Sequence, residues 1–317
     1  MTMDPLFIVG SERSGTTMLR LMLNEHSGLF IPSESHFLET LVRNFPKSRA
    51  LTPEELDQAF SIIVNSRRWQ DWNEDPDLLR EYLNDYSEQT LAQLIDRVFR
   101  FCKDCDATMR WGDKTPKYVY SIHEISQIYP KAKFIHIVRD GRDVCVSMLN
   151  TKWLGSSIRQ IAEHWCSATR AAREAESILD EESYLQIRYE DLVRNNETVL
   201  KAVCEFIGED YQPEILDFYK NTEGKVADRS LKYHKKTAKQ PSSADTNRWR
   251  KELPLSKVLV YEAHAAPQLV ENGYHLRFSG LLRIFPWMVS GVFRVAEITL
   301  PLRSRLGIHF PRISRNF

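Results

Sequence analysis

The chain has 317 residues, 42% of them hydrophobic, and its 43 basic residues balance 43 acidic ones. This length and composition permit a sizeable core in one large α/β domain or two smaller ones, and they exclude a disordered chain. A net charge of zero argues against a general nucleic-acid binder, which usually carries a basic excess. It leaves room for a local cationic pocket, because net charge averages over the whole surface.

Five cysteines scattered along a long chain do not predict a disulfide framework, so we expect a cytoplasmic protein. Cys102 and Cys105 have the CxxC spacing, but no second pair accompanies them. We interpret them as two thiols at the end of a helix rather than as a zinc or redox site. No stretch reaches the ~18 uninterrupted apolar residues that a membrane span needs.

The predicted elements alternate between buried strands and helices. An apolar run bounded by Pro5 and Gly10 predicts the first strand, and a loop of small residues then leads into an apolar helix. The predicted strands cover 6–9, 134–138 and 184–187. The predicted helices begin near residue 16 and cover 141–149, 157–179 and 197–207, with a mostly helical stretch at 35–102. This alternation predicts an α/β protein with three layers, in which helices flank a central parallel sheet.

The loop from Gly10 to Thr17 has the two-glycine spacing of a P-loop. Glycines let the backbone wrap a phosphate, and the N-terminus of the following helix favours the anion. Nucleotide triphosphatases require a lysine where this chain has Thr16. A P-loop kinase or NTPase is therefore disfavoured but stays open, as do a non-catalytic nucleotide-binding protein and an ordinary turn between strand and helix.

Three blocks of sequence, in this order, resemble those of the sulfotransferases that use 3′-phosphoadenosine 5′-phosphosulfate (PAPS). The run Arg-Ser-Gly-Thr-Thr at 13–17 resembles their phosphosulfate loop. The block 137–147 resembles their 3′-phosphate motif, and the resemblance assigns Arg139 and Ser147 to that phosphate. The block 185–192 is similar to a third element, whose tyrosine, here Tyr189, lies near the adenine. The resemblance implies donor binding by these residues: Arg13, Ser14, Gly15, Thr16, Thr17, Arg139, Ser147 and Tyr189.

Within this family the sequence is most similar to the tyrosylprotein sulfotransferases and related bacterial-type enzymes. Residues 13–18, His26, Glu34, 138–142 and 272–274 follow their pattern. The resemblance implies a P-loop-like fold, PAPS as co-substrate, no metal, and in-line transfer of a sulfuryl group to an acceptor hydroxyl or amine. The acceptor stays open among peptides, glycans, lipids and small metabolites, and no nucleic-acid partner is expected.

One residue of the site must take the proton of the acceptor group, and the sequence offers more than one candidate for this base. Small-molecule sulfotransferases place a histidine directly after a Lys-Thr pair, but Pro116 occupies that place here. Glu34 instead matches the catalytic glutamate of the tyrosylprotein branch, so we interpret it as the base. Lys114 and Arg13 are then expected to stabilise negative charge on the leaving group.

Two alternatives for this stretch stay open. Glu34 could be a helix N-terminal acid, with Ser33 or Ser35 as the N-cap. His36 could replace Glu34 as the base.

A lysine-rich stretch from 225 to 239 precedes Trp249 and reads as a surface loop or lid. A weaker part of the resemblance suggests that it closes over the nucleotide together with the segment that follows. Lys239, Arg250 and Lys251 are the residues it would supply. The alternative is a solvated charged loop.

The sequence predicts two regions, a sulfotransferase domain at 1–277 and a basic, apolar segment at 278–317. The segment holds six arginines and one glutamate among aromatic and aliphatic residues, so the domain itself is mildly acidic. This composition suits an interfacial helix at the membrane surface. It suits equally a tail docked on the protein itself or on a second subunit of a homodimer.

Overall fold

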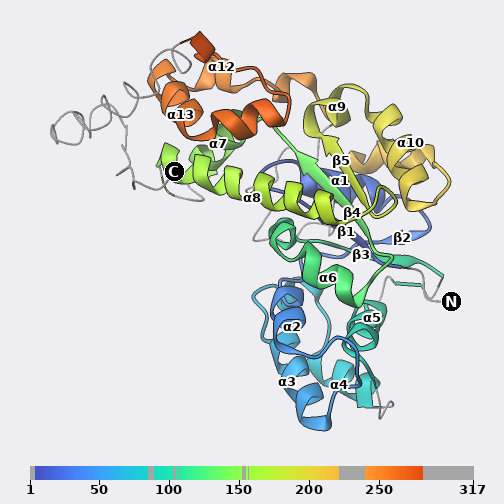
Figure 1. Ribbon diagram of the computed structural model, residues 1–317. Helices are drawn as coiled ribbons and strands as arrows, with labels where there is room; N and C mark the ends of the chain where they lie inside the picture. The colour runs from blue at the N-terminus through green and yellow to red at the C-terminus, as the bar shows by residue number, and fades with distance from the viewer. Residues whose placement is uncertain are drawn as a thin grey trace, which may run out of the picture.

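The computed structural model describes an α/β body and, below it in Figure 1, a lobe of helices. The lobe is the helical part of residues 37–101, and we call it the helical lobe. The described residues are 4–84, 89–102, 105–106, 108–151, 155, 157–220 and 240–280. The predicted lysine-rich stretch with Lys239, and the C-terminal segment from 281 onward, lie outside them. Within the described part, no helix is long and apolar enough to cross a membrane.

Among the described residues, five strands form one parallel sheet in the order β2-β3-β1-β4-β5. Three of these strands confirm the predicted ones. The other two were not predicted, because β2 has only two residues and β3, Arg-Trp-Gly-Asp-Lys, is too polar to read as a buried strand. The strands are β1 Leu6–Val9, β2 Leu29–Phe30, β3 Arg110–Lys114, β4 Lys133–Val138 and β5 Tyr184–Arg188.

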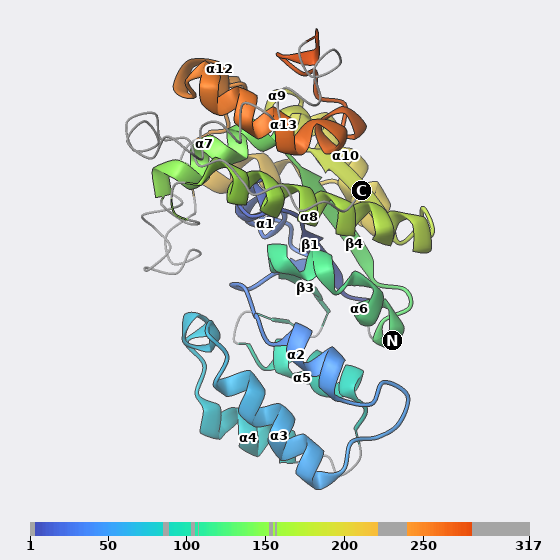
Figure 2. The ribbon, with the colours of Figure 1, turned by 60° about the vertical axis from the view of Figure 1, so that its left-hand side comes forward.

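Helices cover both faces of the sheet, which confirms the expected three layers (Figures 1 and 2). Leu6 and Ile8 of β1 face a core shared with α1 and α10, whereas Phe7 faces a core shared with α6 and α8. Both sides of the strand are apolar because both are buried. The helices of the body are α1 Thr16–Leu23, α6 Ile122–Ile128, α7 Gly141–Thr151, α8 Ile158–Ile178, α9 Tyr189–Arg194, α10 Asn196–Ile207, α12 Trp249–Glu252 and α13 Leu255–Glu271, with 3-10 turns η2 Pro116–Tyr120, η3 Pro213–Lys220 and η4 Ser243–Asp245.

The helical lobe is inserted between the neighbouring strands β2 and β3. It lies within the stretch 35–102 that was predicted to be mostly helical, and prolines occupy the first turns of α3 and α4. The lobe shares its core with the sheet, since Phe99 of α5 stacks on Trp111 of β3 with ring centroids 4.1 Å apart. The lobe consists of α2 Leu38–Asn44, α3 Pro53–Val64, η1 Trp69–Trp72, α4 Pro76–Asn84 and α5 Leu91–Phe101.

A buried ion-pair network fastens α13 to the rest of the body. Arg142 of α7 is almost fully buried and contacts Asp140 at 2.7 Å and Glu262 of α13 at 2.5 Å. The guanidinium also lies over the Trp249 ring, 3.9 Å from its centroid. One side chain therefore connects the end of β4 with α12 and α13.

Arg142→Met is expected to lower the free energy of unfolding by about 3–5 kcal/mol, because it leaves two buried carboxylates without their partner. Denaturant titration would measure the loss. Arg159→Met on α8 is the matched control, because its pair with Glu163 is partly exposed and worth at most ~1 kcal/mol. Equal losses in the two variants would contradict the assigned role of Arg142.

Candidate active site

The predicted phosphate loop lies at the carboxyl end of β1, in the middle of the sheet. The neighbours of β1 are β3 and β4. Beyond β3 lies β2 at one edge of the sheet, and beyond β4 lies β5 at the other edge, so the strand order changes direction at β1. Parallel α/β sheets bind ligands in the crevice at such a switch point. The loop therefore lies beside the ends of both neighbouring strands, where the chain places Lys114 and Arg139.

The loop needs glycine at two positions because other parts of the chain approach it closely. Gly15 has φ 102°, and a Cβ there would lie 2.4 Å from the Tyr189 ring. A Cβ on Gly10 would lie 2.6 Å from the carbonyl oxygen of Ile137. Arg13 also adopts a left-handed backbone, with φ 68°. The loop is thus held in one shape by β4 and α9.

Lys114, the last residue of β3, joins the loop to Glu34. Its Nζ donates to Thr17 Oγ1 at 3.1 Å and to Glu34 Oε1 at 2.5 Å. Three residues far apart in the sequence therefore meet at one ammonium group. The structure brings the predicted base and the predicted leaving-group cation into direct contact.

The surroundings of Glu34 favour its charged form. Burial would raise the pKa of Glu34, but the charge of Lys114 and hydrogen bonds from His36 and Lys114 outweigh it, so the pKa lies well below the usual range. Burial lowers the pKa of Lys114, and Glu34 opposes that effect. Burial likewise lowers the pKa of Arg20 to about 10. Glu34 is thus an ionised carboxylate among cations.

Residues 33–36, which we call the Glu34 turn, do not cap a helix. The N-cap of α2 is Phe37, and no side chain caps it. The reading of Glu34 as a helix N-terminal acid capped by Ser33 or Ser35 is therefore wrong, since the Ser35 hydroxyl bonds to Asp113 instead. His36 has φ 60°, and its Nε2 lies 2.8 Å from Glu34 Oε2.

The predicted 3′-phosphate residues gather on the other side of the loop. Arg13 Nε donates to Ser147 Oγ at 3.1 Å, and Arg139 donates to the carbonyl oxygen of Arg13 at 3.2 Å. The Arg139 guanidinium lies over the Tyr189 ring, 4.1 Å from its centroid, and bonds to the carbonyl oxygen of Asp245 at 2.7 Å. The four predicted side chains, from the loop, the end of β4, α7 and α9, therefore form one cluster.

Several buried polar atoms at this place have no hydrogen-bond partner among the described residues. They include two donors, Ser14 Oγ within the loop and Arg139 Nε beside it. An unpaired buried donor costs free energy unless a ligand satisfies it. These donors, together with the glycines of the loop, fit an anionic group such as a phosphate.

Arg250 and Lys251 are exposed residues of α12, and Arg250 lies over the Trp249 ring at 4.6 Å. The helix is connected to the site because the backbone N–H of Trp249 donates to Asp143 at 2.8 Å. Asp143 in turn lies 4.0 Å from Arg139. The contact of Arg250 and Lys251 with the nucleotide stays a prediction.

Three residues near Glu34 were missed in the sequence analysis. Arg20 is a lone charge in the apolar helix α1, which is a signal that a sequence can show. Asp113 directly precedes Lys114, a residue that the sequence analysis did identify. Arg68, 3.9 Å from Glu34 Oε2, comes from the helical lobe and carries no comparable signal.

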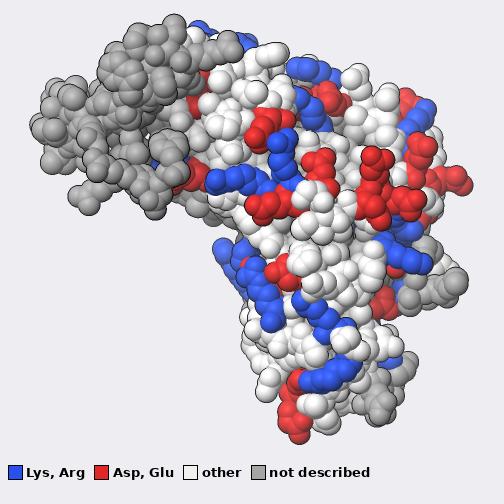
Figure 3. Space-filling view, in the orientation of Figure 1, with Lys and Arg blue, Asp and Glu red and all other residues white. Residues whose placement is uncertain are grey.

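Figure 3 shows acidic side chains gathered on the right of the body, near α10, and basic ones along the edge of the helical lobe. On this face of the body, basic and acidic side chains are interspersed and form no continuous basic surface. A binding site for an anion must therefore depend on a few placed cations, as the cluster around Arg13, Lys114 and Arg139 provides.

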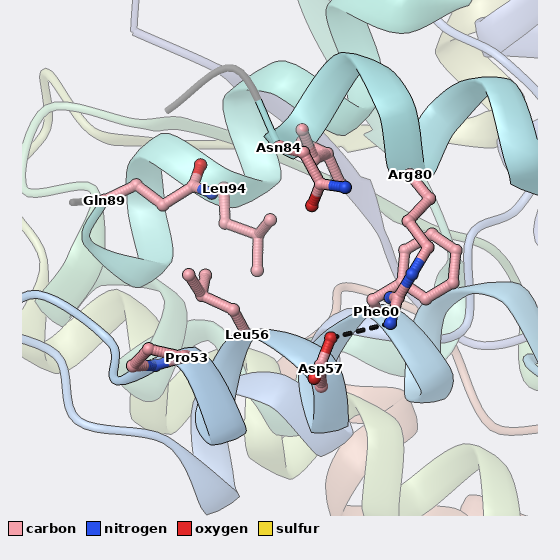
Figure 4. Close-up of a pocket in the computed structure, with 9 residues that line it drawn as sticks. Pro53, Leu56, Asp57, Phe60, Arg80, Asn84, Gln89 and Leu94 are labelled. Carbon is pink, nitrogen blue, oxygen red and sulfur yellow. Dashed lines mark hydrogen bonds and ion pairs between the residues drawn. The ribbon is translucent and has the colours of Figure 1, made fainter. Parts of the chain in front are cut away.

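A separate cavity of about 250 Å³ lies within the helical lobe (Figure 4). It is mostly apolar, with the ion pair of Asp57 and Arg80 at one side. None of the predicted site residues lines it. Within the described residues, no group of His, Cys, Asp and Glu side chains could hold a metal ion.

Gly15→Ala is expected to destabilise the fold more than Gly208→Ala does. Both glycines have positive φ, which costs an alanine about 1–2 kcal/mol. Only at Gly15 would the new Cβ collide with a ring, and overpacking adds about 1–3 kcal/mol. Denaturant unfolding of both variants would show the difference, and equal losses would mean that Tyr189 can move away.

Residues 5–213 match the model of the sulfotransferase family. The chain is 23% identical over 280 residues to a protein-tyrosine sulfotransferase of Drosophila melanogaster, covering 86% of this chain and 52% of that protein. It is 25% identical over 254 residues to the omega-hydroxy-beta-dihydromenaquinone-9 sulfotransferase of Mycobacterium tuberculosis, covering 64% and 62%. It spans about a third of an Aquifex aeolicus relative, to which it is 24% identical over 274 residues covering 80% of this chain.

Among solved structures, the sulfotransferase domain of the curacin biosynthetic pathway aligns with a TM-score of 0.60 at 22% identity, covering 87% of this chain and 99% of that one. This likeness confirms the P-loop-like fold. The family model covers well over half of the chain, so the protein belongs to the sulfotransferase family.

Proposed function

We propose that this protein transfers a sulfuryl group from PAPS to an acceptor hydroxyl, with Glu34 as the base. One observation carries the proposal: Lys114 contacts both Thr17 of the phosphate loop and Glu34. Transfer of a sulfuryl group needs a cation at the leaving oxygen and a base at the acceptor oxygen. The two groups lie side by side at the end of β3.

The residues for the donor lie on both sides of the loop. Backbone N–H groups of the loop and the N-terminus of α1, with Ser14, Thr16 and Thr17, would hold the 5′-phosphosulfate. Arg139 and Ser147 would hold the 3′-phosphate, and Tyr189 would lie beside the base. The unpartnered donors Ser14 Oγ and Arg139 Nε support this assignment. PAPS supplies the sulfuryl group, bound to a phosphate that leaves.

Glu34 would take the proton of the acceptor hydroxyl. In the structure both carboxylate oxygens accept hydrogen bonds, and the low pKa makes Glu34 a weak base in that state. A negative group beside Thr17 would compete with Glu34 for Lys114. The pKa of Glu34 would then rise toward its ordinary range, and the carboxylate would become a better base.

Lys114 also explains how the loop can have a threonine at position 16, where a P-loop NTPase has a lysine. The loop lacks the lysine that a P-loop NTPase uses for its phosphates. Here an ammonium reaches the first turn of α1 from the neighbouring strand, through the 3.1 Å contact with Thr17. This arrangement and the family membership favour a sulfuryl donor over a nucleoside triphosphate.

The named relatives support a hydroxyl acceptor. One is named for tyrosine residues of proteins and another for a hydroxylated menaquinone. These acceptors differ in size and polarity, but each offers an oxygen nucleophile. We therefore propose the acceptor class as hydroxyl compounds.

Glu34→Gln is expected to reduce sulfuryl transfer by about 10²–10⁴-fold, because the amide cannot take a proton. Binding of 3′-phosphoadenosine 5′-phosphate should not weaken, since the loop and Arg139 are intact and Lys114 loses a competing carboxylate. Transfer from labelled PAPS to a tyrosine peptide and to hydroxylated small molecules would be measured, with calorimetry for binding.

Glu39→Gln is the matched control, because Glu39 pairs only with Arg43 and Lys117 among the described ion pairs. It should retain full transfer. Full activity of Glu34→Gln would remove Glu34 from the mechanism. Metal-dependent ATP turnover by the wild type, without binding of 3′-phosphoadenosine 5′-phosphate, would overturn the proposed function.

A further inference from the structure

The Glu34 turn presents two side chains to the site and a third to the interior. Glu34 and His36 contact each other at the site, while Ser35 between them is almost fully buried. A carboxylate on an irregular segment needs an anchor to stay in one position. Besides Glu34, which contacts Lys114, Ser35 is the residue of the turn whose side chain reaches β3.

The anchor of Ser35 is Asp113, the residue before Lys114 on β3. Asp113 Oδ2 accepts a hydrogen bond from the Ser35 hydroxyl, and Oδ1 accepts one from Thr115 at 2.7 Å. Asp113 and Thr115 are both buried. Consecutive residues of β3 therefore hold consecutive residues of the turn, Lys114 holding Glu34 and Asp113 holding Ser35.

The hydrogen bonds run in one direction toward Asp113. The backbone N–H of Leu38 donates to the Tyr118 hydroxyl at 2.9 Å, which lies 2.7 Å from Ser35 Oγ. Ser35 donates onward to the carboxylate, so the Tyr118 hydroxyl must donate to Ser35. An ionised Asp113, which only accepts, sets this direction from α2 to β3.

We propose that Asp113 is a positioning residue that fixes Glu34 for proton transfer through Ser35. The proposal rests on the proposed function of Glu34. It assigns to Asp113 no contact with donor or acceptor. Its effect is geometric, since a displacement of about 1 Å at a reacting group can cost roughly 10²-fold in rate.

The position of Asp113 is unfavourable for stability, which argues for a role other than holding the fold. Burial raises the pKa of Asp113 to about 6, although hydrogen bonds from Ser35 and Thr115 and the charge of His36 oppose this shift. Glu34 adds to the shift, and Lys114 is the neighbouring cation. Because the folded-state pKa lies above that of the unfolded chain, ionisation destabilises the fold as pH rises from about 4 through 6.

Asp113→Asn is expected to slow sulfuryl transfer by about 10–100-fold at pH 7.5 through kcat. An asparagine offers one acceptor oxygen to two hydroxyl donors, so the bond to Ser35 or to Thr115 must be reversed or lost. Binding of 3′-phosphoadenosine 5′-phosphate should stay within twofold. At pH 7.5 the midpoint of thermal unfolding of the variant should equal or exceed that of the wild type. The difference between the two midpoints should shrink at pH 5.

Ser35→Ala removes the other half of the contact and should slow transfer similarly. The double variant should be no slower than Asp113→Asn alone, because both changes break one interaction. Asp96→Asn is the matched control. Asp96 accepts a hydrogen bond from Trp111 of the same strand at 2.7 Å and has no contact with the Glu34 turn among the described hydrogen bonds. It should transfer at the wild-type rate.

Amide hydrogen exchange gives a test that does not depend on activity. In both single variants, exchange at residues 33–38 should become at least tenfold faster, while exchange in the sheet stays unchanged. Unchanged exchange there, or transfer within twofold of wild type, would overturn the proposal. Parallel loss of stability and nucleotide binding would overturn it as well, since Asp113 would then support the whole fold. If the wild type transfers no sulfuryl group, the proposed function fails, while exchange still decides the positioning.

Discussion

A buried ammonium group determines how the candidate site is put together. Lys114 is only 3% exposed, so its charge requires a partner inside the protein, and Glu34 supplies one at 2.5 Å. Since the same Nζ contacts Thr17, the phosphate loop, β3 and the Glu34 turn share one electrostatic centre. Loss of Glu34 would leave the buried ammonium without its ion-pair partner, so the three segments depend on each other for their positions.

The rest of the site follows from the order of the strands. The central strand β1 ends between β3 and β4, and the cations of the site come from these three strand ends. The mildly acidic domain and the neutral total charge hide this local concentration. A few fixed cations suit an anionic ligand better than a diffuse basic surface, because each one is aimed at a single group of the ligand.

The sequence predicted the parts of the fold that local pattern determines. Apolar runs identified β1, β4 and β5, and the glycine loop placed the site at the end of β1. The strand β3 escaped prediction because its burial comes from its neighbours rather than from its own polar residues. Glu34 and Lys114 were identified through family motifs, but the use of Ser35 by Asp113 depends on two segments 78 residues apart. No local pattern carries such a contact, and local reasoning wrongly offered Ser35 as a helix cap.

The helical lobe reaches the Glu34 turn through contacts of its own. Trp72 of η1 donates to the carbonyl oxygen of Ser33 at 2.8 Å, and Ser66 donates to that of Ser35 at 3.3 Å. A chimeric protein that received the lobe of a relative would therefore inherit a different support for its carboxylate. An exchange of lobes between members of the family should therefore keep these two donors. Without them, the graft would change the surface of the lobe and displace the Glu34 carboxylate at the same time.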